Sequence, residues 1–145
     1  MNRNEIIARL MENDSTVLSF PDRGPWGDQK YRGNCSGWYQ AFLIWKYKVK
    51  KFAELFAGSG TGFDVAKDMK IDYVGADLNP TPVRPGILCV NAVTDEVPIQ
   101  FTDADFLFMH PPYGAEIRIP YAVFGNDNRG SIFTTCSGNF AVVVS

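Results

Sequence analysis

The chain has 145 residues, of which 46% are hydrophobic and 21% charged, and its formal net charge at pH 7 is -2. This length and composition predict one soluble globular domain that buries a core of its own. The charge excludes a general electrostatic attraction to nucleic acid or to anionic membranes, so any contact with a nucleic acid depends on a local basic patch. The only dense basic run is KYKVKK, residues 46–51. We interpret it as a solvated helix end that leads into a strand, with a nucleic-acid contact as the alternative.

Cysteine usage and hydropathy limit the cellular compartments in which the protein is expected. The three cysteines, Cys35, Cys89 and Cys136, are widely spaced and form no CxxC pair. This pattern argues against a disulfide framework or a metal site and fits a reducing cytoplasm. No run approaches the ~18 apolar residues of a membrane span, and the N-terminus does not read as a signal peptide. We therefore expect a cytoplasmic protein with no metal and no membrane partner.

The N-terminal part, residues 1–47, predicts two helices separated by a long loop. The first helix carries four apolar residues on one stripe, which are Ile6, Ile7, Leu10 and Met11. Residues 14–37 are rich in Gly, Pro, Asp and Asn, and a loop of that length is usually functional or disordered. Residues 38–47, WYQAFLIWKY, predict a helix that buries its aromatic side.

An alternation of strands and helices follows. Strands are predicted at 51–56, 71–77, 86–90 and 104–109, with a glycine turn at 58–62 and a helix at 63–70. This rhythm is typical of an α/β fold with a parallel sheet and crossovers. Between the third and fourth strands we expect only a loop or a short helical turn. We assign residues 1–145 to a single domain, with its cofactor and catalytic core at 51–113 and an irregular tail at 114–145. One further strand is predicted in that tail, at 140–145.

The glycine turn suggests a ligand. In ELFAGSGTG, Gly58, Gly60 and Gly62 allow a tight turn and a close approach of the backbone to a bound group. The segment lacks the Lys-Ser/Thr of a phosphate-binding loop and the third glycine position of the dinucleotide fingerprint. Asp77 ends the next strand, 19 residues after Gly58, where a carboxylate accepts two hydrogen bonds from ribose hydroxyls. The pair favours a nucleoside-type cofactor, although DLNP is also a typical capping turn.

The third strand is followed by a further polar position. Asn91 stands where a side chain can meet an adenine ring, and the alternative is that it is a turn residue. Asp95 competes with it for the adenine contact.

The fourth strand ends in HPPY, residues 110–113, at the same sheet edge as the glycine turn. Two prolines rigidify the turn, remove two N–H donors and leave carbonyl groups as acceptors. An exocyclic amino group of a base needs such acceptors, and Tyr113 offers a flat face to a flipped-out base. The structural alternative is a proline-rich loop that closes the core.

The three motifs ELFAGSGTG, VGADLNP and HPPY, in that order, resemble those of S-adenosylmethionine-dependent amino-methyltransferases. The group that they resemble most is the DNA methyltransferases of adenine N6 or cytosine N4, whose catalytic motif reads Asp/Asn/Ser-Pro-Pro-Tyr. The resemblance implies a Rossmann-like class I methyltransferase fold with a mostly parallel sheet, incomplete at the C-terminus. It implies S-adenosyl-L-methionine as cofactor and DNA as partner.

The resemblance also assigns residues. Residues 20–44 resemble the segment before the glycine turn in phage- and prophage-type members, which implies that four residues border the methionine end of the cofactor: Tyr31, Arg32, Asn34 and Ser36. The motifs imply further cofactor contacts from Glu54, Phe56, Gly58, Gly60, Asp77, Leu78 and Asn91. The implied catalytic residues are His110, Pro111, Pro112 and Tyr113.

Two departures from the family pattern qualify the expected function. His110 stands where the family has Asp, Asn or Ser, and only a neutral imidazole has the acceptor nitrogen that holds an amino proton. The chain is also too short for the full sheet and target-recognition region of that family. We expect direct methyl transfer to a DNA base amine, adenine N6 rather than cytosine N4. Cytosine C5 is disfavoured because no Pro-Cys dipeptide occurs. The alternatives are an RNA or protein-glutamine N-methyltransferase, and a non-catalytic truncated remnant.

Overall fold

The computed structural model describes residues 1–13, 17–31, 34–92, 94–111 and 139–142. Its elements, in chain order, are α1 (Arg3–Met11), α2 (Gly37–Lys46), β1 (Lys51–Leu55), α3 (Thr61–Met69), β2 (Asp72–Asp77), β3 (Ile87–Cys89), the short 3-10 helix η1 (Ile99–Phe101), β4 (Phe106–Met109) and β5 (Asn139–Val142). All the strand pairs are parallel, and the strands form one sheet in the order β3-β2-β1-β4-β5. The predicted α/β class, the four strands predicted between residues 51 and 109 and the short helical turn before β4 are confirmed. Of the strand predicted at 140–145, residues 140–142 belong to β5, and residues 143–145 lie outside the described residues.

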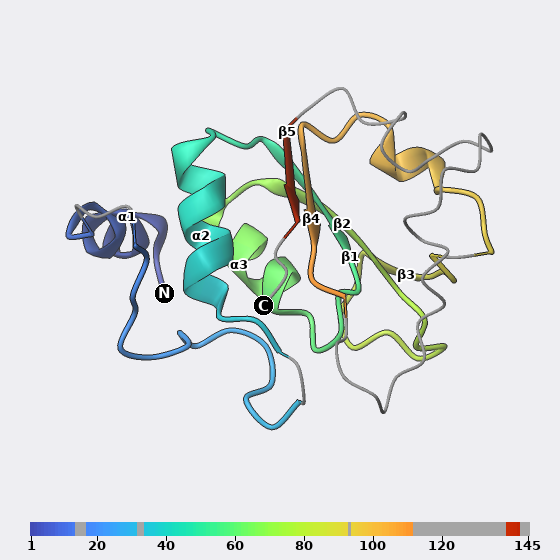
Figure 1. Ribbon diagram of the computed structural model, residues 1–145, viewed down its shortest axis with the longest axis horizontal. Helices are drawn as coiled ribbons and strands as arrows, with labels where there is room; N and C mark the ends of the chain where they lie inside the picture. Colours follow the sequence, from blue (N-terminus) through green and yellow to red (C-terminus); the bar gives the residue numbers. More distant parts are fainter. Residues whose placement is uncertain (14–16, 32–33, 93, 112–138, 143–145) are drawn as a thin grey trace.

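The helices α1, α2 and α3 cover one face of the sheet, and η1 lies on the other (Figure 1). Successive residues of β1 point to opposite faces, so Phe52 packs under the helices while Ala53 packs toward η1. On the helix side Phe52 stacks on Phe106, with ring centroids 5.8 Å apart. On the other side Phe101 of η1 is fully buried against residues of β1, β2 and β4. The sheet is therefore buried on both faces, as parallel sheets require.

Local signals explain where α1 begins and how it packs. The side chain of Asn2 accepts a hydrogen bond from the Glu5 amide, and the Glu5 carboxylate accepts one from the Asn2 amide, which completes a capping box. Ile6 and Leu10 are fully buried. The prediction that Met11 shares their buried stripe is wrong, since Met11 is 66% exposed. The helix ends at Met11 and covers only the margin of the layer, so one i, i+4 pair suffices for its contact.

The loop before α2 is tied to the helices by hydrogen bonds and ring contacts. Asp22 accepts a hydrogen bond from the Trp38 indole at 2.8 Å, and with Arg9 beside it the pKa of this carboxyl falls to about 2. The Trp26 indole donates to Asp68 at 2.9 Å and packs edge-on against Trp38. These contacts hold the described part of the loop against α2 and α3, which brings its end to the sheet edge.

Other expectations concern the surface. Lys46 ends α2, Lys48 and Lys50 are exposed, and β1 begins at Lys51, so the basic run is a solvated helix end that leads into a strand, as predicted. The two described cysteines, Cys35 and Cys89, are free. Within the described ranges, no helix is long and apolar enough to cross a membrane, and no group of His, Cys, Asp or Glu is arranged to hold a metal ion.

Candidate functional site

A pocket opens at the carboxyl ends of β1 and β4, the two neighbouring strands between which the order of the sheet reverses. Open α/β sheets bind their ligands at such a switch point. The pocket is lined by Tyr31, Asn34, Cys35, Gln40, Glu54, Phe56, Ala57, Gly58, Ser59, Thr61 and His110. Its free volume is only about 30 Å³. Since ligand pockets usually measure ~300 Å³ or more, a nucleoside-sized molecule requires its walls to move.

The glycine turn forms the wall that continues β1. Phe56, Gly58 and Gly60 all have positive φ angles, of 63°, 49° and 79°. Glycine adopts these angles without strain, whereas Phe56 does so at a cost of ~1–3 kcal/mol, a feature that clusters at functional sites. The turn is held by hydrogen bonds from the Ala57 amide to the Ala76 carbonyl, at 3.0 Å, and from the Gly60 amide to the Ala57 carbonyl, at 2.8 Å. Backbone rather than side chains therefore forms the rim of this wall.

Gly62, the third glycine, has a separate reason to be glycine. It lies in the first turn of α3, where a Cβ atom would stand 2.7 Å from the carboxyl carbon of Glu54 and closer still to one oxygen. The missing side chain lets α3 pass directly over the buried carboxyl group. Gly58 and Gly60 are therefore glycines because of their φ angles, and Gly62 because α3 approaches Glu54 closely.

Asp77 lies next to this turn and uses both of its carboxylate oxygens. One accepts a hydrogen bond from the Gly58 amide at 2.7 Å, and the other from the Asn79 amide at 2.9 Å. The second bond is the Asx turn that the capping interpretation predicts. The first joins Asp77 to the glycine turn across two strands. Because a carboxylate has about four acceptor positions, both bonds leave capacity for ribose hydroxyls.

Glu54 is a buried carboxyl group, 3% exposed, on the central strand. It accepts hydrogen bonds from the Gln40 side-chain amide at 2.8 Å and from the Tyr73 hydroxyl at 2.7 Å. Burial outweighs these two bonds and raises the pKa of Glu54 to about 8, so the carboxyl is neutral at neutral pH. The amide oxygen of Gln40, itself buried, accepts no hydrogen bond among the described residues.

Sequence reasoning identified Glu54 but missed Gln40 and Tyr73. Gln40 is the one amide side chain in the apolar run of α2, and this is the signal that indicates it. Tyr73 is the second residue of β2 and carries no comparable mark, because its role depends on the pairing of β1 with β2. The pKa of Tyr73 is raised well above its ordinary value by burial and by Glu54.

The segment before α2 supplies the outer wall. Tyr31 lies over the glycine turn, since a Cβ atom at Gly58 would come within 3.0 Å of its ring. Burial, then Asp77, raise the pKa of the Tyr31 hydroxyl. The amide oxygen of Asn34 accepts a hydrogen bond from the Thr61 hydroxyl at 2.6 Å. Tyr31 and Asn34 therefore reach the pocket, as expected for two of the four residues assigned to the methionine end.

For the other two residues of that set, a contact with the cofactor stays a prediction. Ser36 caps α2, because its hydroxyl accepts a hydrogen bond from the Trp38 amide and donates one to the Arg23 carbonyl. It is not a lining residue of the pocket as it stands. Arg32 lies outside the described residues.

His110 closes the pocket from the end of β4. Burial, and then the nearby cation of Arg23, lower its pKa below 6.5. Both effects favour the neutral imidazole, the form that has an acceptor nitrogen. Pro111 follows it, half-buried, and does not line the pocket. Pro112 and Tyr113 lie outside the described residues, so the base-binding part of the HPPY motif stays a prediction.

Leu78 and Asn91 do not line the pocket as it stands. Leu78 is 68% exposed in the turn after β2. Asn91 begins a turn in which its amide donates to the Asp95 carboxylate at 2.8 Å and its carbonyl accepts from the Asp95 amide at 2.9 Å. Asp95 therefore holds this turn together, and a contact of either residue with adenine stays a prediction.

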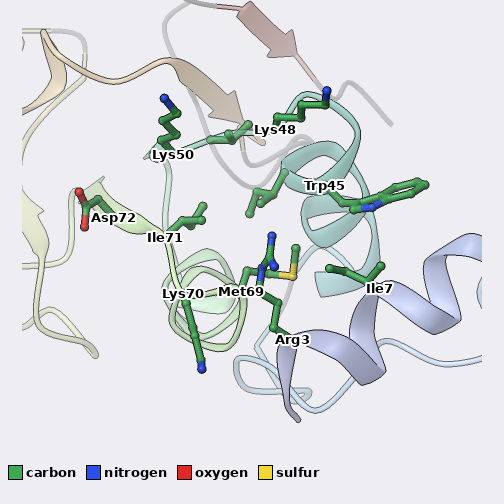
Figure 2. Close-up of a pocket in the computed structure, with 11 residues that line it drawn as sticks. Arg3, Ile7, Trp45, Lys48, Lys50, Met69, Lys70, Ile71 and Asp72 are labelled. Atoms are coloured by element: carbon green, nitrogen blue, oxygen red, sulfur yellow. The ribbon is translucent and has the colours of Figure 1, made fainter.

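A larger cavity, of about 540 Å³, lies at the opposite edge of the sheet, where β1 and β2 begin. Its basic residues do not converge on one point. In Figure 2, Lys48, Lys50 and Lys70 point away from its middle, and only Arg3 reaches toward it. A small-molecule site needs polar groups that aim at one place. The smaller pocket at the switch point meets this condition, and it is the candidate site despite its volume.

The pocket unites segments that are far apart in the sequence, since Tyr31 and Gln40, Glu54 and Thr61, and His110 all line it. No family model matches this sequence, and no curated protein matches it.

Proposed function

We propose that the chain is an S-adenosyl-L-methionine-dependent methyltransferase that acts on an exocyclic amine of a base in DNA, adenine N6 rather than cytosine N4. One observation carries the proposal. Gly58 of the glycine turn and His110, the first residue of HPPY, line the same pocket although they lie far apart in the sequence. A methyltransferase needs its cofactor site and its amine site to share one cavity, because the two reacting atoms must touch.

The chemistry of the lining favours this cofactor over a nucleotide that binds through phosphates. Phosphate sites rely on Lys, Arg or a metal ion as well as on backbone amides. Among the described lining residues there is neither Lys nor Arg, and the wall carries the Glu54 carboxyl instead. Such a wall suits a cofactor that has a ribose but no phosphate groups, and Asp77 beside the turn would accept hydrogen bonds from the ribose hydroxyls.

The chain's residues would position the reactants rather than react themselves. When bound, the cofactor would supply a methyl group on a sulfonium for in-line attack by the amine nitrogen, with the sulfur leaving as a neutral thioether. His110 in its neutral form accepts one amino hydrogen, and the carbonyl groups of the proline turn accept the other. This orients the nitrogen lone pair at the methyl carbon, while Tyr113 stacks on the base. The amine then loses one proton to water.

The strand order supports a Rossmann-like class I methyltransferase fold as part of the proposal. The order β3-β2-β1-β4-β5 matches five strands of the doubly wound sheet, with the pocket at the switch point. Because the free volume is about 30 Å³, the walls of the pocket have to move before a nucleoside can enter. DNA as partner and a location in the cytoplasm belong to the same proposal.

The test is transfer of a tritiated methyl group from S-adenosylmethionine to DNA, to RNA and to protein, offered separately. We expect label in DNA, in adenine, and less label at a limiting cofactor concentration when Asp77→Ala replaces the wild type. Label in RNA or on glutamine would replace the proposed substrate with one of those. Cofactor binding without transfer to any substrate would identify a non-catalytic remnant. No binding of cofactor by calorimetry would refute the proposal.

A further inference from the structure

The larger cavity, at the sheet edge opposite the candidate site, has an apolar floor. Its volume of about 540 Å³ lies within the ~300–1,000 Å³ that is usual for binding clefts. The floor combines residues of α1, α2 and α3 with residues that directly precede β1 and β2, and these are Ile7, Ile44, Val49, Met69 and Ile71. An apolar hollow of this size suits the apolar side chains of a partner better than it suits water.

The rim of the same cavity is cationic. It carries Arg3, Lys48, Lys50 and Lys70, and Asp72 is the one acidic residue among the lining residues that the structure describes. We call the apolar floor and this rim together the basic cavity. The chain as a whole has a net charge of -2, so the basic cavity is a local exception to the sign of the molecule. Such a region attracts an anionic partner.

The rim charges are not neutralised within the described part of the chain. None of the four rim cations makes an ion pair there, whereas Arg9, Lys51 and Arg84 each pair with a carboxylate. The protein therefore neutralises several cations elsewhere and leaves these four available to a ligand.

Three of the four rim cations stand where local structure disfavours them. Lys48 and Lys70 follow α2 and α3 with φ angles of 53° and 58°, in the left-handed region where glycine is the usual residue. Arg3 is the first residue of α1, where the helix dipole favours an acid over a cation. Lys48 and Lys70 do gain from the dipoles of the helices that they follow, but this does not account for Arg3 or Lys50. Fold stability therefore does not explain the set, and strained residues of this kind cluster at functional sites.

The arrangement of the cations selects the kind of ligand. In Figure 2, Lys48, Lys50 and Lys70 surround the middle of the cavity and point away from it. One small anion cannot meet them all, but several separate carboxylates can, if they flank a group that fills the middle. A peptide with an apolar residue between Asp or Glu residues has both features. A DNA backbone has the charges but leaves the apolar floor uncovered.

We propose that the basic cavity is a docking site for an acidic segment of another protein, whose apolar side chain enters the cavity while the flanking carboxylates pair with the rim. The inference does not depend on the proposed function, because the two sites lie at opposite ends of β1. Val49 and Lys50 precede this strand, whereas Phe56 and Gly58 follow it. A protein bound at the basic cavity leaves the candidate site open to its substrate.

The probe is a library of short random peptides displayed on phage and selected on the immobilised full-length chain. We expect the selected peptides to carry Asp and Glu around at least one large apolar residue. The affinity of the strongest peptide is then measured by fluorescence anisotropy. Replacing its apolar residue with Ser should weaken binding by about 10- to 100-fold, the usual effect of removing a buried apolar side chain. Added salt should weaken binding as well.

Charge reversal on the protein locates the peptide. Lys70→Glu should weaken the peptide by about 5- to 30-fold, since it exchanges an attraction for a repulsion at an exposed position. Lys67→Glu makes the same change at an exposed position of α3 outside the basic cavity, and affinity should stay within about twofold of wild type. Equal losses in the two variants would mean that the peptide responds only to net charge, and this would overturn the docking site.

Glycine variants separate binding from folding. Lys48→Gly and Lys70→Gly remove a side chain from a left-handed position, so each should raise the urea midpoint of unfolding. Each should also weaken the peptide by about threefold or more, because a rim charge is lost. Unchanged peptide affinity in both folded variants would refute the role of the rim.

Other occupants give other results. If duplex DNA binds wild type but not Lys70→Glu, and no acidic peptide is selected, the basic cavity is a nucleic-acid surface. If sedimentation velocity shows a dimer that Lys70→Glu dissociates and Lys67→Glu does not, the occupant is a second copy of this chain. Either result would overturn the proposal, as would a selection that yields no peptide or only peptides without Asp and Glu.

Discussion

Replacing Glu54 with Gln should change how the stability of the protein depends on pH. The pKa of this carboxyl rises from 4.5 to about 8 on folding, because the side chain is buried without a cation. Between these two values the folded protein holds a proton that the unfolded chain has released. The contribution of Glu54 to stability is therefore highest at or below about pH 4.5, falls as pH rises, and levels off above about pH 8.

The magnitude follows from the size of the shift. Each pKa unit corresponds to about 1.4 kcal/mol, so the shift of Glu54 represents up to ~5 kcal/mol over the whole range. Relaxation of the pocket and entry of water reduce that figure, and we expect ~3–5 kcal/mol. Glu54→Gln has nearly the same shape, and its amide keeps hydrogen bonds to Gln40 and Tyr73. The variant lacks the titration and should be more stable than wild type at and above pH 8.

The assay is urea unfolding at intervals from pH 5 to pH 9, followed by circular dichroism. The informative quantity is the difference between the free energies of unfolding of variant and wild type, since all other titrating groups cancel. It should rise steadily in favour of Glu54→Gln until about pH 8. Glu96→Gln changes an exposed carboxyl and is the matched control, whose difference should stay flat. Parallel curves for wild type and Glu54→Gln would refute the reasoning.

Four further predictions concern the site. Gly62→Ala should lower the free energy of unfolding by ~1–3 kcal/mol, the usual range for overpacking, although a helical Gly→Ala change ordinarily raises it by up to ~1 kcal/mol. Urea unfolding should show that this loss is recovered in a Glu54→Ala background, and no loss in the single variant would contradict the close contact between Gly62 and Glu54. Asp77→Ala should weaken S-adenosylhomocysteine by ~1.5–3 kcal/mol, and unchanged calorimetric affinity in a folded variant would remove the cofactor assignment. His110→Asp should keep methyl transfer and lose the acid limb of the pH–rate profile. In wild type the midpoint of that limb should lie below pH 6.5, because the pKa of His110 is lowered. Superimposable acid limbs for wild type and variant would exclude a catalytic role for His110. Tyr113→Ala should lose most transfer while binding the cofactor within a few fold, since stacking on a base contributes ~1–3 kcal/mol, and a matching loss of cofactor binding would place Tyr113 elsewhere.

Local pattern was enough to predict the elements and their class. Apolar runs bounded by glycine, proline and asparagine located β1, β2, β3 and β4, because a strand buried on both faces has few polar positions. The glycine turn and Asp77 were also visible in the sequence, since backbone angles and strand ends leave short-range marks. Their direct hydrogen bond, 19 residues apart, follows from two adjacent parallel strands.

Tertiary structure alone decided what surrounds Glu54. Its partners come from α2 and β2, and they meet because α2 packs over β1 while β2 pairs beside it. No local pattern encodes such a meeting, and the same is true of Gly62, whose missing side chain makes room for a carboxyl group on another element. Ser36 caps α2 in the structure, and its assignment to the cofactor by motif stays a prediction. The ionisation state of Glu54 also belongs to this level, because burial is a property of the packed chain, and a carboxyl's charge depends on what surrounds it in space rather than in sequence.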